Sequence, residues 1–77
     1  MQKIRPDLDI GKSIRNLRLE NKMKQDEVVT KLNLMGLPIS RSTYAKIETN
    51  RMNIKVSELK ALKEIFNVDY DAFFDDI

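Results

Sequence analysis

The sequence predicts an all-α protein of five short helices. Apolar residues recur at spacings of three and four, as they do on one face of a helix. Strict alternation of apolar and polar residues, which is typical of a strand, is absent from the chain. With 77 residues, the chain has room for one hydrophobic core and not for a second. We therefore expect a single domain over residues 1–77, in which residues 1–8 form an N-terminal arm.

The first two expected helices span residues 10–22 and 25–35. Asp9 is a suitable N-cap for the first helix. The inward face of this helix consists of Ile10, Ile14 and Leu17. The inward face of the second helix consists of Val28, Val29, Leu32 and Met35. Lys24 stands where serine, threonine or aspartate is expected, so the start of the second helix is poorly marked.

A Gly-Leu-Pro break separates the second helix from a third, which is expected over residues 41–49. Gly36 suits the left-handed position that ends a helix, and Pro38 prevents the helix from resuming. Ser40 is a good N-cap for the third helix. The inward face of the third helix consists of Tyr44 and Ile47, with Ile39 just ahead of them.

The fourth and fifth helices are expected over residues 56–67 and 70–75, after a loop at 49–55. The inward face of the fourth helix consists of Leu59, Leu62, Ile65 and Phe66. The fifth helix carries Tyr70, Phe73 and Phe74 behind the N-cap Asp69. Lys55 precedes the fourth helix in place of a usual N-cap residue, so this start is poorly marked as well.

Composition argues against several classes of protein. The chain has no cysteine and no histidine, which removes the thiol nucleophile, the commonest general base and the commonest metal ligand. The carboxylates and hydroxyls form no grouping of nucleophile and base, so we expect no enzyme, no metal and no cofactor. No apolar run is long enough to span a membrane, and the N-terminal residues lack the apolar region of a secretory signal. We expect a cytoplasmic protein without a membrane partner.

Charge is divided unevenly along the chain. Residues 1–63 hold all 14 lysines and arginines but only seven of the 12 acids, whereas residues 64–77 hold five acids and no base. Such asymmetry is typical of a protein with one surface that attracts polyanions. The alternative is an ordinary solvated surface, and the arrangement of the cations has to decide between them.

The third helix has an outer face suited to a DNA groove. This face, which we call the reading face, consists of Arg41, Ser42, Ala45, Lys46 and Thr49. It interleaves small residues with two long cations, and neither cation has an acidic partner four residues away on the helix. Arg41 is suited to a bidentate contact with guanine, and Ser42 to donating or accepting a hydrogen bond. The alternative is a solvated helix face without a ligand.

Four motifs in register carry a family resemblance. They read Ile10-Gly11-x-x-Ile14-x-x-Leu17-Arg18, Gln25-x-Glu27-Val28-Val29-x-x-Leu32, Ile39-Ser40-Arg41-Ser42-Thr43-Tyr44-x-x-Ile47-Glu48 and Leu59-x-x-Leu62-x-x-Ile65-Phe66-x-Val68. The chain resembles the Cro/lambda-repressor-like helix-turn-helix domains, or XRE family, over about residues 10–74. The resemblance implies a lambda-repressor-like DNA-binding fold in which the helix-turn-helix is central.

The resemblance also implies roles for individual residues. The positions that meet base edges in the major groove are Arg41, Ser42 and Lys46. The positions that contact DNA phosphates are Gln25, Thr43, Asn50, Arg51 and Asn53. Gln25 also braces the recognition helix in this family, and Arg18 and Glu48 match a pair that forms a salt bridge between the first and third helices.

The chain departs from the family pattern at the connector between the second and third helices. Six residues, Asn33 to Pro38, separate Leu32 from Ile39, where the family commonly has one. This spacing predicts a variant with a lengthened turn and a longer second helix. The turn after the third helix also differs, because Thr49-Asn50-Arg51 replaces the usual glycine-containing turn, although asparagine tolerates a left-handed backbone.

We therefore expect a sequence-specific, double-stranded DNA-binding transcriptional regulator of bacterial or phage type, with helix 41–49 in the major groove. A homodimer on an inverted repeat is expected, with Tyr70, Phe74 and Ile77 as candidates for its interface. The alternative is a protein-interaction module, antitoxin-like or an anti-repressor partner, that uses the last turn and the 33–38 connector.

Lys3 and Arg5 in the arm either reach DNA or remain solvated. The acids of the last turn fit helix capping better than a cation site.

Overall fold

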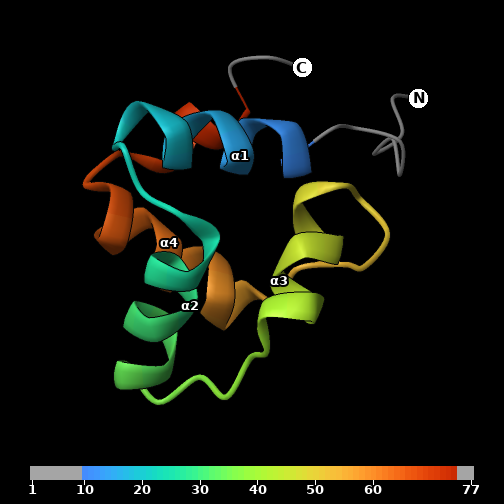
Figure 1. Ribbon diagram of the computed structural model, residues 1–77. Coiled ribbons are helices and arrows are strands. Elements are labelled where there is room, and N and C mark those ends of the chain that lie inside the picture. The colour runs from blue at the N-terminus through green and yellow to red at the C-terminus, as the bar shows by residue number, and fades with distance from the viewer. Residues whose placement is uncertain (1–9, 75–77) are drawn as a thin grey trace.

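The computed structural model describes residues 10–74, which form four α-helices and one 3₁₀ turn without a strand (Figure 1). The elements in chain order are α1 (Ile10–Glu20), α2 (Gln25–Leu34), α3 (Arg41–Glu48), α4 (Val56–Phe66) and η1 (Tyr70–Phe73). The all-α prediction is confirmed, and every expected helix has a counterpart. The arm at residues 1–8, the cap Asp9 and the C-terminal Ile77 lie outside the described residues.

All four α-helices end in the same way, with a residue of left-handed backbone. These residues are Lys22 (φ 57°), Gly36 (φ 88°), Asn50 (φ 60°) and Asn67 (φ 55°). At each one, its own N–H and the following N–H donate to carbonyls three and five residues back, which is the Schellman pattern. The left-handed Lys22 ends the first helix at Glu20, so the predicted end at residue 22 is wrong.

The other boundaries differ from the prediction by smaller amounts. The second, third and fourth helices end at Leu34, Glu48 and Phe66, each one residue earlier than expected. The extra residues before Ile39 therefore lengthen the connector and not α2, so the expected longer second helix is wrong. The fifth element is a 3₁₀ turn of four residues, Tyr70–Phe73, and not a helix over 70–75.

The two poorly marked helix starts are capped by an acid three residues into the helix. The backbone N–H of Lys24 donates to Oε1 of Glu27 at 2.7 Å, and that of Lys55 donates to Oε1 of Glu58 at 2.8 Å. A glutamate at this position satisfies an otherwise unpaired backbone donor, as in the second half of a capping box. At α3, the expected cap is present, since Oγ of Ser40 accepts from the backbone N–H of Thr43 at 3.1 Å.

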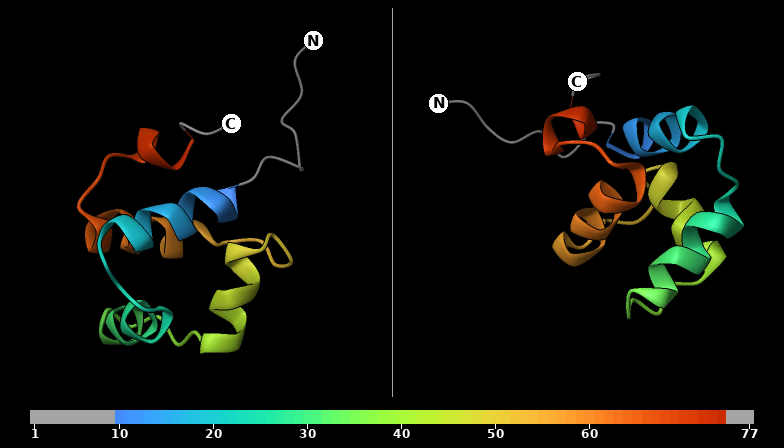
Figure 2. Two further views of the ribbon diagram at one scale, coloured as in Figure 1. Left: turned by 45° about the horizontal axis from the view of Figure 1, so that its top comes forward. Right: turned by 90° about the vertical axis from the view of Figure 1, so that its left-hand side faces the viewer.

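The core lies between α1 and η1 on one side and the other three helices on the other (Figure 2). Its fully buried side chains include Ile14, Val28, Leu32, Tyr44, Ile47, Leu62, Phe66 and Phe73. Leu59 and Ile65 are only partly buried, whereas Ala61 is buried in their place on the inner face of α4. Met35 was expected inside but is 42% exposed, because it follows the end of α2.

The lengthened connector is held by side-chain hydrogen bonds. Nδ2 of Asn33 donates to the carbonyls of Leu37 at 2.8 Å and of Ile39 at 3.1 Å. Leu37 is half-buried and Ile39 is buried, so both attach the connector to the core. The connector therefore delivers the chain to Ser40 at a defined position, from which α3 begins.

Candidate nucleic-acid interface

The reading face of α3 points to solvent. Arg41, Ser42, Lys46 and Thr49 are exposed, and Ala45 is half-buried between them. Tyr44 and Ile47 on the opposite face are 0% and 2% exposed, respectively. The helix thus packs on the core through its rear face, and within residues 10–74 its polar face is accessible to a ligand.

One cation on this face pairs with an acid from another helix. Nε of Arg41 lies 3.2 Å from Oδ1 of Asp26, in the first turn of α2. Both side chains are largely exposed, at 65% and 69%. The pattern within helix 41–49 shows no acid near Arg41, and only the packing of α2 beside α3 supplies one.

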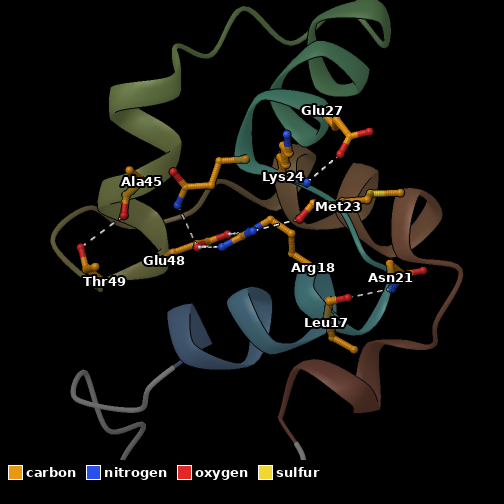
Figure 3. A network of polar contacts seen from close by, with 10 residues as sticks. Leu17, Arg18, Asn21, Met23, Lys24, Glu27, Ala45, Glu48 and Thr49 are labelled. Atoms are coloured by element: carbon orange, nitrogen blue, oxygen red, sulfur yellow. Dashed lines mark hydrogen bonds and ion pairs between the residues drawn. The ribbon is translucent and has the colours of Figure 1, made fainter.

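A buried network ties the end of α3 to α1 and α2 (Figure 3). The guanidinium of Arg18 donates twice to the Glu48 carboxylate, from Nε to Oε2 at 2.7 Å and from Nη2 to Oε1 at 3.1 Å. Arg18 also donates from Nη1 to the carbonyl of Met23 at 3.0 Å, and Gln25 donates from Nε2 to Oε1 of Glu48 at 3.0 Å. Such a bidentate pair fixes distance and direction together, so three helices meet at one carboxylate.

The network shifts the ionisation of both charged partners. Burial by itself would raise the pKa of Glu48, but the hydrogen bond from Arg18, with further lowering by Tyr44, Gln25 and the charge of Arg18, outweighs it and holds this pKa below its usual value. The hydrogen bond to Glu48 raises the pKa of Arg18. Both groups are therefore charged at neutral pH, and the pair is ionic inside the fold.

The turn after α3 contacts the start of α1. Oδ1 of Asn50 accepts a hydrogen bond from the backbone N–H of Gly11 at 3.0 Å. Gly11 is buried, and a Cβ at this position would meet the backbone carbonyl oxygens of Ile47 and Glu48, the latter at 2.7 Å. The glycine thus permits close approach of α1 to α3, and Asn50, expected at a phosphate, uses its side-chain oxygen within the fold.

The remaining expected phosphate contacts lie on two sides of α3. Arg51 is exposed, and its Nε donates to Oγ1 of Thr49 at 3.2 Å beside the reading face. Thr43 and Asn53 line a hollow of about 170 Å³ between the start of α3 and the loop before α4. Lys55 lines the same hollow, and sequence reasoning considered it only as a weak helix cap. The position of Lys55 in the loop after the third helix was the sequence feature that indicated a phosphate contact.

A model of the family described as helix-turn-helix domain matches residues 11–76, most of the chain. The protein belongs to this helix-turn-helix family. The resemblance stated from the sequence is thereby confirmed. No curated protein and no solved structure matches the chain.

In this helix-turn-helix domain, α2 and α3 are the paired helices, and residues 35–40 form the turn between them. Tyr70 and Phe74, which were expected at a dimer interface, are 42% and 45% exposed, on η1 and directly after it. Nζ of Lys63 lies 5.4 Å from the centre of the Tyr70 ring, a cation–π distance. Lys3, Arg5 and Ile77 lie outside the described residues.

Within residues 10–74, the helix-turn-helix domain has neither a cluster of metal ligands nor a membrane-spanning helix. No group of three or more acids within this part of the chain is arranged to hold a metal ion. No helix in the same described range is long and apolar enough to cross a membrane.

Proposed function

We propose that the protein is a sequence-specific, double-stranded DNA-binding transcriptional regulator of bacterial or phage type. The observation that carries this proposal is the exposed reading face of α3, which has two cations and no acid of its own, on a helix whose rear is buried. In a helix-turn-helix domain, the second helix of the motif enters the major groove. The width of that groove, about 12 Å, admits an α-helix with small side chains between its donors.

Base reading is assigned to Arg41, Ser42 and Lys46, all of which are exposed on the reading face. The long cations reach guanine acceptors, and the hydroxyl of Ser42 is suited to several bases. These contacts supply discrimination between sequences, whereas contacts to phosphates supply most of the affinity.

Phosphate contacts are assigned to the residues around the reading face. They are Gln25, Thr43, Asn50, Arg51, Asn53 and, in addition, Lys55. Gln25 bonds Glu48 with one amide N–H, and its second N–H is suited to a phosphate oxygen. The side chain of Lys55 adds a positive charge beside the hollow that Thr43 and Asn53 line.

A homodimer would place two copies of α3 on an inverted repeat. Successive half-sites on one side of B-DNA are roughly 34–36 Å apart, which is one helical turn. The exposed rings of Tyr70 and Phe74, together with Ile77, are the proposed contact between the two copies.

The test is enrichment of duplexes from a random pool by the full chain, followed by titration at several salt concentrations. The proposal expects one enriched motif with two-fold symmetry, and binding to it that weakens steeply as salt rises. Binding that depends neither on sequence nor on salt would exclude the proposal.

One observation favours the alternative, a protein-interaction module of antitoxin-like or anti-repressor type. Leu34 is 82% exposed and Met35 is 42% exposed, side by side at the start of the lengthened connector. Together they line a hollow of about 350 Å³ with Lys31, Glu64 and Ile65. This role predicts a protein partner that binds equally well when no duplex is present.

A further inference from the structure

The first turn of α2 contacts both ends of α3. Gln25 bonds Glu48, the last residue of α3, and the next residue, Asp26, pairs with Arg41, the first residue of α3. The contact with Glu48 is partly buried and belongs to the network that positions the helix. The contact with Arg41 is exposed at the edge of the reading face, so it acts on a side chain and not on the position of the helix.

We infer that Asp26 is a specificity-determining residue, which positions the guanidinium of Arg41 toward a guanine and disfavours other sequences. The inference rests on the proposed function, because it concerns the same DNA-reading face. Asp26 is a positioning residue here, since it acts on DNA through Arg41.

The geometry of the pair leaves the outer edge of the guanidinium for DNA. Asp26 engages Nε of Arg41, whereas Nη1 and Nη2 belong to a side chain that is 65% exposed. The guanidinium is planar and its N–H donors form a rigid fork, so a carboxylate on one edge sets the direction of the other donors. Guanine presents O6 and N7 as two acceptors that match this fork. Restraint before binding also reduces the rotamer freedom that Arg41 loses on binding.

The charge of Asp26 acts in the opposite direction on all other sequences. Its carboxylate is 69% exposed beside a surface proposed to face phosphates, and like charges repel. At a mismatched base, Arg41 finds no matching pair of acceptors, so no new hydrogen bond offsets the repulsion between Asp26 and the DNA. The repulsion from Asp26 thus acts on every duplex, and it is offset only at the base pair that the positioned Arg41 matches, which increases discrimination.

If the Asp26–Arg41 pair served only to stabilise the fold, the loss of Asp26 would lower the thermal midpoint and weaken binding to every duplex equally. Exposed ion pairs contribute little to folding stability, so the loss of Asp26 is expected to leave the thermal midpoint nearly unchanged. The informative measurement is therefore the penalty for changing each base pair of the bound duplex, one at a time.

The experiment compares the wild type with Asp26→Ala, Arg41→Ala and the double variant. The probe is a duplex enriched by the wild type, with single-base-pair variants and a scrambled form. Arg41→Ala identifies the base pair that Arg41 reads, because the penalty for changing that pair disappears. Asp26→Ala is expected to reduce the penalty at this same pair by about threefold or more and to raise affinity for the scrambled duplex by about two- to fivefold. In the Arg41→Ala background, removal of Asp26 is expected to leave all penalties unaltered.

The control is Glu20→Ala, which removes an acid from an exposed site at the end of α1, a residue to which no DNA or dimer contact is assigned. It is expected to leave the profile of penalties unchanged. An Asp26→Ala profile identical to that of the control would overturn the role of Asp26, as would equal losses at every base pair with a lower thermal midpoint. If the wild type enriches no duplex, the proposed function itself fails and this inference falls with it.

Discussion

Nε of Arg18 lies 2.7 Å from Oε2 of Glu48, and this ion pair joins the first helix to the last residue of the third. The two side chains are only 10% and 1% exposed, so water screens them poorly. Removing one partner of a buried pair leaves an uncompensated charge, which destabilises more than the intact pair stabilises. The pair therefore defines where α3 sits, and with it where the reading face points.

Replacement of Arg18 by methionine is expected to lower the free energy of unfolding by about 3–5 kcal/mol, because Glu48 loses its charged partner. Urea denaturation measures this loss. The control is Arg15→Met on the exposed face of the same helix, for which a change within about 0.5 kcal/mol is expected. The double variant Arg18→Met/Glu48→Met is expected to recover most of the loss. An equal loss in the Arg15 variant would assign the effect to helix α1 and not to the pair.

Acid is expected to weaken the fold through Glu48. Its pKa lies below the usual 4.5 in the folded chain, so the unfolded chain binds the proton more readily. The ionised Glu48 carboxylate therefore contributes fully to the free energy of unfolding above pH 4.5, and this contribution is lost as pH falls through the lower pKa of the folded chain. The measurement is the free energy of unfolding as a function of pH for the wild type and Glu48→Gln. Glu48→Gln is expected to lose less stability on acidification, whereas the control Glu20→Gln should follow the wild type.

The two glycines are expected to respond differently to alanine. Gly11→Ala introduces a Cβ against the carbonyl oxygens at the end of α3, so helices must shift, at a cost of about 1–3 kcal/mol or more. Gly36 has open space around it but a φ of +88°, so Gly36→Ala should cost about 1–2 kcal/mol from backbone strain alone. Chemical denaturation and duplex binding together distinguish the two cases. Only Gly11→Ala is expected to weaken duplex binding beyond its effect on folding, because it displaces α3.

Much of the fold follows from local sequence signals. The periodicity of apolar residues locates all five elements, and Gly36 and Ser40 mark the end of α2 and the start of α3. The helix starts at Lys24 and Lys55 are poorly marked at the N-cap position itself, because lysine is not a usual N-cap residue. The signal lay three residues later, in Glu27 and Glu58.

Other features of the fold depend on tertiary structure, and no local sequence pattern predicts them. Lys22 has a left-handed backbone although lysine has no preference for it, and the prediction therefore extended the first helix too far. The Asp26–Arg41 pair depends on how α2 packs beside α3, which no single-helix pattern contains. Asn50 satisfies the backbone of Gly11, 39 residues away, and the resemblance alone assigned it to a phosphate.

Arg51 and Arg41 are expected to differ in their effect on DNA binding. Arg51→Ala should weaken binding to specific and scrambled duplexes alike and reduce the salt slope by about one, because a phosphate contact carries no sequence information. Arg41→Ala should cost about 1–3 kcal/mol on the specific duplex and less on the scrambled one. Titrations of both variants on both duplexes at several salt concentrations provide the comparison. Equal losses on the two duplexes for Arg41→Ala would remove it from base reading.

The proposed dimer contact is expected to be sensitive to Phe74 and insensitive to Leu34. Phe74→Ser removes an aromatic side chain that is 45% exposed on the last turn, and we expect weaker cooperative binding to an inverted repeat with unchanged binding to a half-site. Leu34→Ser is the matched control, since Leu34 is 82% exposed on α2. Sedimentation velocity with the two duplexes measures both effects. If the Leu34 variant lost association and the Phe74 variant did not, the contact between copies would be assigned to the end of α2 and the lengthened connector. Such a loss would not reflect unfolding, because Leu34 is 82% exposed and contributes little to the core.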